Sequence, residues 1–210
     1  MPKREQIKNL LSDLLGPKGA MRHCLFVLVS YSLFFTIFFS PVIFHDSLLA
    51  PGGGRLGDAV VSHIPYYLSE KLSWDPLLAC GFPMVADPQA MSWYPPALLL
   101  SLIPGTWNIF VISAFVMAAC FAYGYVYTLT VKQSAAAVAG TTYSMCGFMF
   151  AHLGHTAMIH SAVWLPLIVW SLEMLRRKAS RFWLATGCLA VACCVFAGHL
   201  QIVVYSLIIS

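Results

Sequence analysis

CLFVLVSYSLFFTIFFSPVIF, residues 24–44, is a run of 21 residues without a charge. As an α-helix it would rise about 31 Å at 1.5 Å per residue, which matches the hydrocarbon thickness of a bilayer. A secretory signal peptide has a shorter apolar region and a small-x-small cleavage site, and the end of this run offers no such site. We therefore predict an uncleaved first transmembrane helix over 24–44.

The composition extends this prediction to the whole chain of 210 residues. Apolar residues make up 60% of the sequence and charged residues 10%, and the mean hydropathy is +0.78. A soluble domain carries about 25% charged residues, and a disordered chain lacks such apolar content. The net charge of +4 gathers in no long basic tract with interleaved aromatic residues, so nucleic acid is not an expected partner. The sequence predicts an all-α polytopic membrane protein.

Four segments complete the predicted organisation. Residues 1–23 form a basic N-terminal segment, which is equally compatible with a short surface helix and a frayed tail. Residues 45–106 form a long polar loop with short helices, and within it the apolar run 95–103 either lies on the surface or begins a bent span. Residues 107–210 hold predicted spans at 107–131, 134–153, 157–175 and 182–198, and a truncated span at 201–210. Because the last run covers half a bilayer, we expect an N-terminal fragment of a longer protein.

The positions of lysine and arginine predict the orientation. With the N-terminus in the cytoplasm, ten of the twelve basic residues lie inside: Lys3, Arg4, Lys8, Lys18, Arg22, Lys132, Arg176, Arg177, Lys178 and Arg181. Only Arg55 and Lys71 lie outside. Glu173 is one turn before Arg176 and Arg177, so we expect it to pair with them at the inner interface.

This orientation places most other ionisable side chains on the outer face. They are five of the eight acidic residues, Asp46, Asp58, Glu70, Asp75 and Asp87, and six of the seven histidines, His45, His63, His152, His155, His160 and His199. Such a face suits group transfer, because a carboxylate can act as general base on a hydroxyl or bind a divalent cation beside a phosphate. The alternative is that polar residues gather in any outer loop without doing chemistry.

The remaining motifs are weaker. His152, His155 and His160 match no zinc spacing, and Gly154 interrupts the helix that would align them, so no metal ligand is assigned. Trp74 lies in the outer loop, where it could stack on a sugar ring or belong to an aromatic belt. The seven cysteines show neither a disulfide framework nor metal spacing, and we expect them to be small apolar packing residues.

A series of short motifs follows the first span. They are Gly57-Asp58, Pro65-Tyr66, Trp74-Asp75-Pro76, Gly81-Phe82-Pro83, Asp87-Pro88-Gln89, Tyr94-Pro95-Pro96, Trp164-Leu165-Pro166 and Gly198-His199-Leu200-Gln201. In this order, over about residues 24–210, the series resembles the N-terminal part of the bacterial YfhO-type membrane proteins, which belong to the type C (GT-C) superfamily of glycosyltransferases. The chain departs from the usual family pattern at Asp75 and Asp87, where asparagine is usual, at Leu200, where proline is usual, and in having fewer spans.

The resemblance implies transfer of a sugar from a lipid-linked donor of the polyprenyl phosphate type to a cell-envelope acceptor. It implies an outer-face site in the bacterial cytoplasmic membrane, with Asp58 as the catalytic acid, since such folds place one in the first outer loop. The candidate substrate-binding residues are Trp74, Asp87, Gln89, Tyr94, His152, His199 and Gln201. Cofactors are left open, a divalent cation among them, and the surrounding partner is membrane lipid.

Two alternatives stay open. Asp58 could be the N-cap of a helix that begins near Ala59, a common position for aspartate. The protein could also be a non-catalytic polytopic membrane protein, such as a transporter-like or assembly subunit, or an inactive remnant. Transporters carry ionisable residues in the middle of their spans. Here the polar groups gather in the outer loop, which favours the enzyme.

Overall fold

The computed structural model describes residues 17–45, 47–51, 57–69, 74–76 and 78–210. Within these ranges the chain is mostly helical, and the one piece of β-structure is an isolated bridge between Asp75 and Phe82. The prediction of a helical chain is confirmed for this part. The expected surface helix in 1–23 falls largely outside the described residues, as do Arg55 and Lys71.

Among the described residues, three helices are long and apolar enough to cross a membrane. They are Met21–Phe38 within α2 (Pro17–Phe38), α6 (Trp107–Thr130), and Thr156–Arg177, which joins α9 (Thr156–Ala162) to α10 (Trp164–Arg177). Large apolar side chains of α2, including Leu25, Phe26 and Ile37, are exposed on the protein surface. An exposed apolar helix face of this kind is suited to contact with lipid.

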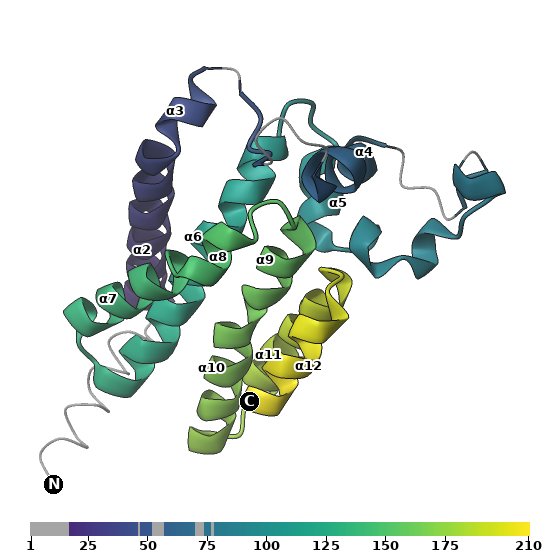
Figure 1. The fold of residues 1–210 in the computed structure, drawn as a ribbon. Helices are drawn as coiled ribbons and strands as arrows, with labels where there is room; N and C mark the ends of the chain where they lie inside the picture. Colours follow the sequence, from purple (N-terminus) through teal and green to yellow (C-terminus); the bar gives the residue numbers. More distant parts are fainter. Residues whose placement is uncertain (1–16, 46, 52–56, 70–73, 77) are drawn as a thin grey trace, which may run out of the picture.

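Helix α6 is the centre of the bundle. It packs against α2, α5 (Pro95–Ser101), α7 (Gln133–Ser144) and α10, and α11 (Arg181–Phe196) packs on the far side of α10 (Figure 1). Glycines allow the closest approaches, because a Cβ atom at Gly140 would overlap the hydroxyl of Tyr31 and one at Gly124 would overlap the ring of Trp170. Small residues at helix crossings are typical of membrane bundles.

The run 134–153, predicted as one span, is divided into two helices. Helix α7 ends at Ser144, and α8 (Gly147–Ala151) begins after Cys146, whose backbone is extended. The hydroxyl of Ser144 donates to the carbonyl oxygen of Gly140 at 2.8 Å, a bond that often bends a helix. The 12 residues of α7 rise about 18 Å, which is less than the thickness of a bilayer core.

A proline explains the boundary between α9 and α10. Pro166 has no N–H to donate to the carbonyl oxygen of Ala162, four residues earlier. The hydroxyl of Tyr143 donates to that oxygen instead, at 2.8 Å. The bond replaces the missing hydrogen bond within the helix and joins α7 to α9.

The polar loop and two inter-helix turns lie at one end of the molecule. Helix α3 (Ser40–Ile43) precedes the loop. The loop itself contains η1 (Ala59–His63), α4 (Ile64–Leu68), η2 (Leu78–Cys80), η3 (Met84–Ala86), η4 (Pro88–Ala90) and α5. The α8–α9 turn and the turn between α11 and α12 (Leu200–Ile209) reach the same end (Figure 1). Trp107 fixes the loop to α6, since its indole N–H donates to the carbonyl oxygen of Leu49 at 3.2 Å.

Candidate functional site

Asp58 and His155 meet at this polar end. The Nδ1 atom of His155, in the α8–α9 turn, lies 3.1 Å from the Oδ2 atom of Asp58, at the start of η1. The two side chains are 46% and 61% exposed, so a molecule at the surface can reach both. The side chain of Asp58 makes no N-cap hydrogen bond. In this structure the side chain of Asp58 therefore does not cap the helix.

His63 lies next to this pair but is buried. Its ring centroid is 6.2 Å from that of His155, at a steep interplanar angle. Burial lowers the pKa of His63, and nearby His155 lowers it further, while the carboxylates of Asp58 and Asp87 act in the opposite direction. Its Nδ1 atom has no hydrogen-bond partner among the described residues. The imidazole is therefore neutral near pH 7 and has a free position on one ring nitrogen.

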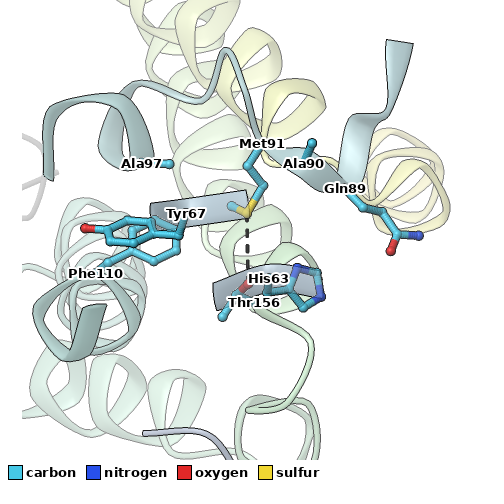
Figure 2. A pocket seen from close by; sticks show the side chains of 8 residues that line it. All are labelled: His63, Tyr67, Gln89, Ala90, Met91, Ala97, Phe110 and Thr156. Carbon is cyan, nitrogen blue, oxygen red and sulfur yellow. Dashed lines mark hydrogen bonds between the residues drawn. The ribbon is translucent and has the colours of Figure 1, made fainter. Parts of the chain in front are cut away.

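A small cavity of about 10 Å³ adjoins His63. Figure 2 shows it between the η1–α4 segment, the loop around Met91, and α6, with Tyr67 and Phe110 forming an aromatic wall. The hydroxyl of Thr156 lies 4.0 Å from the sulfur of Met91 beside it. A cavity of this size holds about one water molecule, so it is too small for a sugar.

His199 is a further histidine near His155. It begins α12, and its backbone N–H donates to the hydroxyl of Ser161 at 3.2 Å. Burial lowers the pKa of His199, and the proximity of His155 and His152 adds to this effect. Its Nδ1 atom is buried and, within the described part of the chain, unpartnered. The predicted residue His199 is thus part of the cluster.

A glycine makes this approach possible. Gly198 has a φ angle of +96°, and a Cβ atom there would overlap the carbonyl oxygen of Pro88 in η4. The α11–α12 turn therefore lies directly against η4. The contact fixes His199 relative to the loop that carries Asp87 and Gln89.

Asp87 and Gln89 lie at the edge of the cluster. The Oδ1 atom of Asp87 accepts from the backbone N–H of Gln89 at 2.9 Å, which stabilises the start of η4. Asp87 also lines an open groove of about 170 Å³, whose other walls include Trp93, Phe196 and Leu200. The Gln89 side chain points away from the aromatic wall (Figure 2). Both residues are exposed at least in part, and Asp87 has a backbone role in addition to any substrate contact.

Trp74 belongs to a separate small motif. Asp75 and Phe82 exchange two backbone hydrogen bonds of 2.8 Å, and the Asp75 side chain accepts from the backbone N–H of Leu78 at 3.3 Å. The indole of Trp74 covers Gly81, where a Cβ atom would lie 2.7 Å from the ring. This segment, around η2, extends away from the helices (Figure 1). The structure therefore does not bring Trp74 to the histidine cluster.

Tyr94 is a core residue in this structure. Its side chain is fully buried, and its hydroxyl group lies 3.1 Å from Nδ1 of His160 and accepts from the indole N–H of Trp164 at 3.2 Å. The ring of His160 stacks on Phe110 at 4.1 Å. The expectation that His160 lies on the outer surface is corrected, because its side chain packs inside the bundle. Tyr94, predicted to contact substrate, is buried beside it.

We expect Tyr94→Phe to lower the free energy of unfolding by about 1–3 kcal/mol, because it leaves His160 and Trp164 buried without a partner. Tyr205→Phe is the matched control, since the hydroxyl of Tyr205 is exposed and contacts the exposed amide of Gln201. Its effect should stay within about 0.5 kcal/mol. Thermal unfolding in detergent compares the two, and equal midpoints would contradict the assignment of Tyr94 to the core.

The last two predicted residues, His152 and Gln201, differ in their position relative to the cluster. His152 ends α8, where its Nδ1 atom lies 2.8 Å from the carbonyl oxygen of Phe148 and its ring packs on that phenyl ring. It is close enough to affect the pKa of His199. Gln201 bonds to Tyr205 at 2.6 Å on the exposed surface of α12. His152 thus adjoins the cluster, whereas Gln201 has an exposed partner on its own helix.

The site is therefore the cluster of Asp58, His63, His155 and His199, which we call the outer-end cluster. Sequence reasoning chose Asp58 and His199 but included neither His63 nor His155 among the site residues. Both were visible as outer-face histidines, and only the helix packing shows that they meet Asp58. Among the described residues, no three His, Cys, Asp or Glu side chains are arranged to hold a metal ion. We derive no step through a divalent cation.

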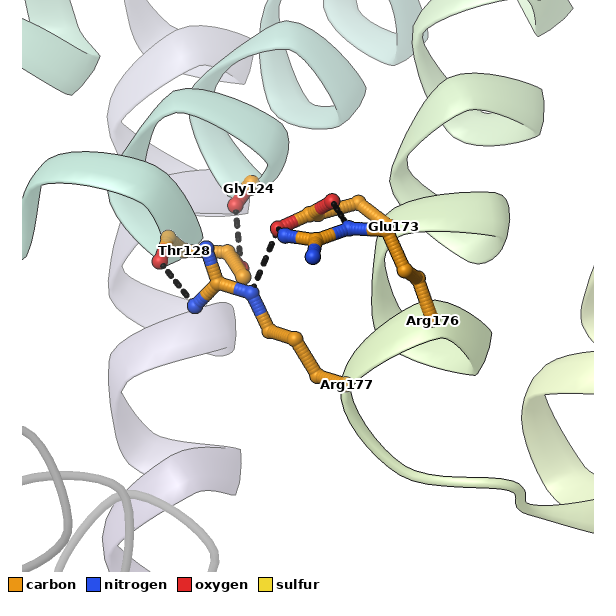
Figure 3. Close-up of polar contacts among 5 residues, drawn as sticks. All are labelled: Gly124, Thr128, Glu173, Arg176 and Arg177. Carbon is orange, nitrogen blue, oxygen red and sulfur yellow. Dashed lines mark hydrogen bonds and ion pairs between the residues drawn. The ribbon is translucent and has the colours of Figure 1, made fainter.

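The opposite end of the bundle carries the cationic residues of the α10–α11 connection. Glu173 accepts from the guanidinium of Arg176 at 2.8 Å and from that of Arg177 at 2.6 Å, and Arg177 also donates to the carbonyl oxygen of Thr128 at 2.9 Å (Figure 3). The predicted pairing of Glu173 is confirmed. The contact with Thr128 joins the ends of α10 and α6. All seven cysteines are free thiols; Cys193 and Cys194 are buried, whereas Cys24, Cys80 and Cys188 are exposed and do not pack inside the protein.

No family model, no curated protein and no solved structure matches this chain.

Proposed function

We propose that the chain is a membrane-embedded glycosyltransferase-like protein of the GT-C type. It transfers a sugar from a lipid-phosphate-linked donor to a cell-envelope acceptor on the outer face of a bacterial cytoplasmic membrane. The observation that carries the proposal is the accessible Asp58–His155 pair at the polar end of an apolar helical bundle. The resemblance of the motif series to YfhO-type proteins supplies the reaction class.

The position of the pair suits a lipid-linked donor. The pair lies just beyond the end of the apolar helices, at the depth where lipid headgroups meet water. The phosphate of such a donor, and the anomeric bond next to it, would sit at that depth. The apolar groove beside Asp87, walled by Trp93, Phe196 and Leu200, opens at the same end.

The chemistry requires a proton acceptor at this place. The oxygen of an acceptor hydroxyl forms a bond to the anomeric carbon, and the bond between that carbon and the phosphate oxygen breaks. The electron pair leaves with the lipid phosphate, and the hydroxyl proton moves to the Asp58–His155 pair. General-base assistance of this kind is typically worth about 10²–10⁴-fold in rate.

Turnover of lipid-linked sugars tests this proposal. The purified chain in proteoliposomes is given polyprenyl-phosphate-linked glucose, galactose or mannose, each labelled in the sugar, together with a cell-envelope extract. We expect label to leave the donor lipid and appear in a second product. A protein that consumes none of the three donors above the rate of empty liposomes would contradict the proposal.

The proposed topology has its own test. We expect the N-terminus and the α10–α11 connection to be cytoplasmic and the polar loop to be outside, because of the basic-residue bias. A single cysteine is placed at Ala86 or at Ala179, both exposed, in a cysteine-free background. An impermeant thiol reagent added to intact cells should label position 86 and not position 179. Labelling of position 179 alone would show the reverse orientation.

A further inference from the structure

The pairing with Asp58 leaves one nitrogen of His155 available. Nδ1 faces the carboxylate at 3.1 Å, and no other described residue forms a hydrogen bond with the ring. A proton on Nδ1 donates to the carboxylate, and Nε2 then carries the lone pair. The side chain of His155 is 46% exposed, so a molecule at the surface can reach the ring.

An imidazole held in this way is a better proton acceptor than the carboxylate itself. In model compounds the pKa of histidine is roughly 2.6 higher than that of aspartate, so the imidazole is the stronger base. The most effective general base is one that titrates near the working pH. In carboxylate–histidine pairs the acid fixes the orientation of the ring and stabilises the imidazolium without taking up the proton.

The neighbours of His155 favour this division of roles. The titratable groups near it are Asp58 at the start of η1, His63 at the end of η1 and His199 in the α11–α12 turn. Burial lowers the pKa of both His63 and His199, so these two imidazoles are neutral near pH 7. A protonated His155 therefore meets a carboxylate and two uncharged rings rather than further positive charge.

We propose that Nε2 of His155 takes the proton of the acceptor hydroxyl, and that Asp58 is the positioning residue that orients the ring. This inference rests on the proposed function, since it assigns one proton of that reaction. The hydroxyl oxygen forms the new bond to the anomeric carbon, the carbon–phosphate oxygen bond breaks with its electron pair, and the proton is held on His155 until water removes it.

The first test compares His155→Gln with His45→Gln in the donor assay. His45 is a matched control, because it is an exposed histidine at the same end whose Nδ1 lies 2.9 Å from the backbone carbonyl oxygen of Pro41. We expect His155→Gln to lower turnover by about 10²–10⁴-fold and His45→Gln to leave it unchanged. The loss in His155→Gln should lie in kcat rather than in KM, because the substitution removes a proton acceptor and not a donor-binding surface. Equal turnover in the two variants would contradict the role of His155.

A second test probes the Asp58–His155 pair by chemical modification instead of an activity assay. Diethyl pyrocarbonate modifies accessible imidazole nitrogens, and mass spectrometry at one fixed pH follows the rate of modification of His155. In Asp58→Asn we expect this rate to change, because the Nδ1 atom of His155 no longer faces a carboxylate at 3.1 Å. The rate at His45 should not change. An unchanged rate at His155 would overturn the pairing.

The two tests separate the inference from the proposed function. If the wild type consumes no donor, the proposed function fails, and the assigned proton transfer fails with it. If the wild type is active and His155→Gln is equally active, only the inference is overturned. The role of His155 stands if activity is lost in His155→Gln and the rate of His155 modification changes in Asp58→Asn.

Discussion

Asp58→Asn is expected to lower the rate of sugar transfer by about 10²–10⁴-fold while leaving the protein folded. Asparagine keeps the shape of the side chain but loses the negative charge that faces His155 at 3.1 Å. The substituted protein should unfold within about 0.5 kcal/mol of the wild type, because exposed ion pairs contribute little to stability and Asp58 forms no cap bond. Initial rates in the donor assay and thermal unfolding give both quantities.

Asp75→Asn is the matched control for this prediction. Asp75 lies in the segment around η2, where its side chain accepts from the backbone N–H of Leu78. An asparagine oxygen can accept the same bond, so both activity and stability should be retained. If Asp58→Asn were fully active, or if the two substitutions reduced activity equally, Asp58 would have no special role in transfer.

Gly198→Ala is expected to have the largest effect on folding. The residue has a φ of +96°, which disfavours any side chain, and the added Cβ atom would overlap the Pro88 carbonyl oxygen. Together the backbone strain and the overlap should cost about 2–5 kcal/mol. The α11–α12 turn should move away from η4 and take His199 out of the outer-end cluster. Thermal unfolding in detergent measures the loss.

Two other glycines separate the effect of the positive φ from the effect of the overlap with Pro88. Gly105 also has a positive φ, of +78°, but nothing lies within 4 Å of its hypothetical Cβ atom. Gly147 has neither a positive φ nor a neighbour within that distance. We expect Gly147→Ala to be nearly neutral and Gly105→Ala to cost about 1–2 kcal/mol. A Gly198→Ala protein as stable as Gly105→Ala would show that the contact with Pro88 does not exist.

The long apolar helices were predictable because a bilayer sets their length and excludes charge. The uncharged run from Cys24 forms most of α2 and continues into the short helix α3, and the run from Trp107 forms α6. The break inside 134–153 was not predictable in this way. Gly, Ser and Thr are common in continuous membrane helices, so their presence alone does not indicate an interruption. The backbone at Cys146 is nevertheless extended and separates α7 from α8.

The site was predictable only in part. Asp58 follows Gly57 soon after the first apolar run, and His199 lies in the last motif, so their order along the chain drew attention to both. The partner His155 is far from Asp58 in sequence, and only the packing of α9 against its neighbours brings them together. The burial of Tyr94 was not predictable from the sequence either. Its motif placed it in the polar loop, yet its ring enters the core and bonds to His160 and Trp164.

Cross-linking of a donor analogue tests most directly whether the outer-end cluster is the site of sugar transfer. A polyprenyl-phosphate-linked sugar with a photoreactive group on the sugar is bound to the purified protein in lipid nanodiscs, and the modified peptides are identified by mass spectrometry. We expect labelling of η1, the α8–α9 turn and the α11–α12 turn, and competition by unlabelled donor. Labelling confined to the α10–α11 connection, or equal labelling by a phospholipid with the same photoreactive group, would contradict the account.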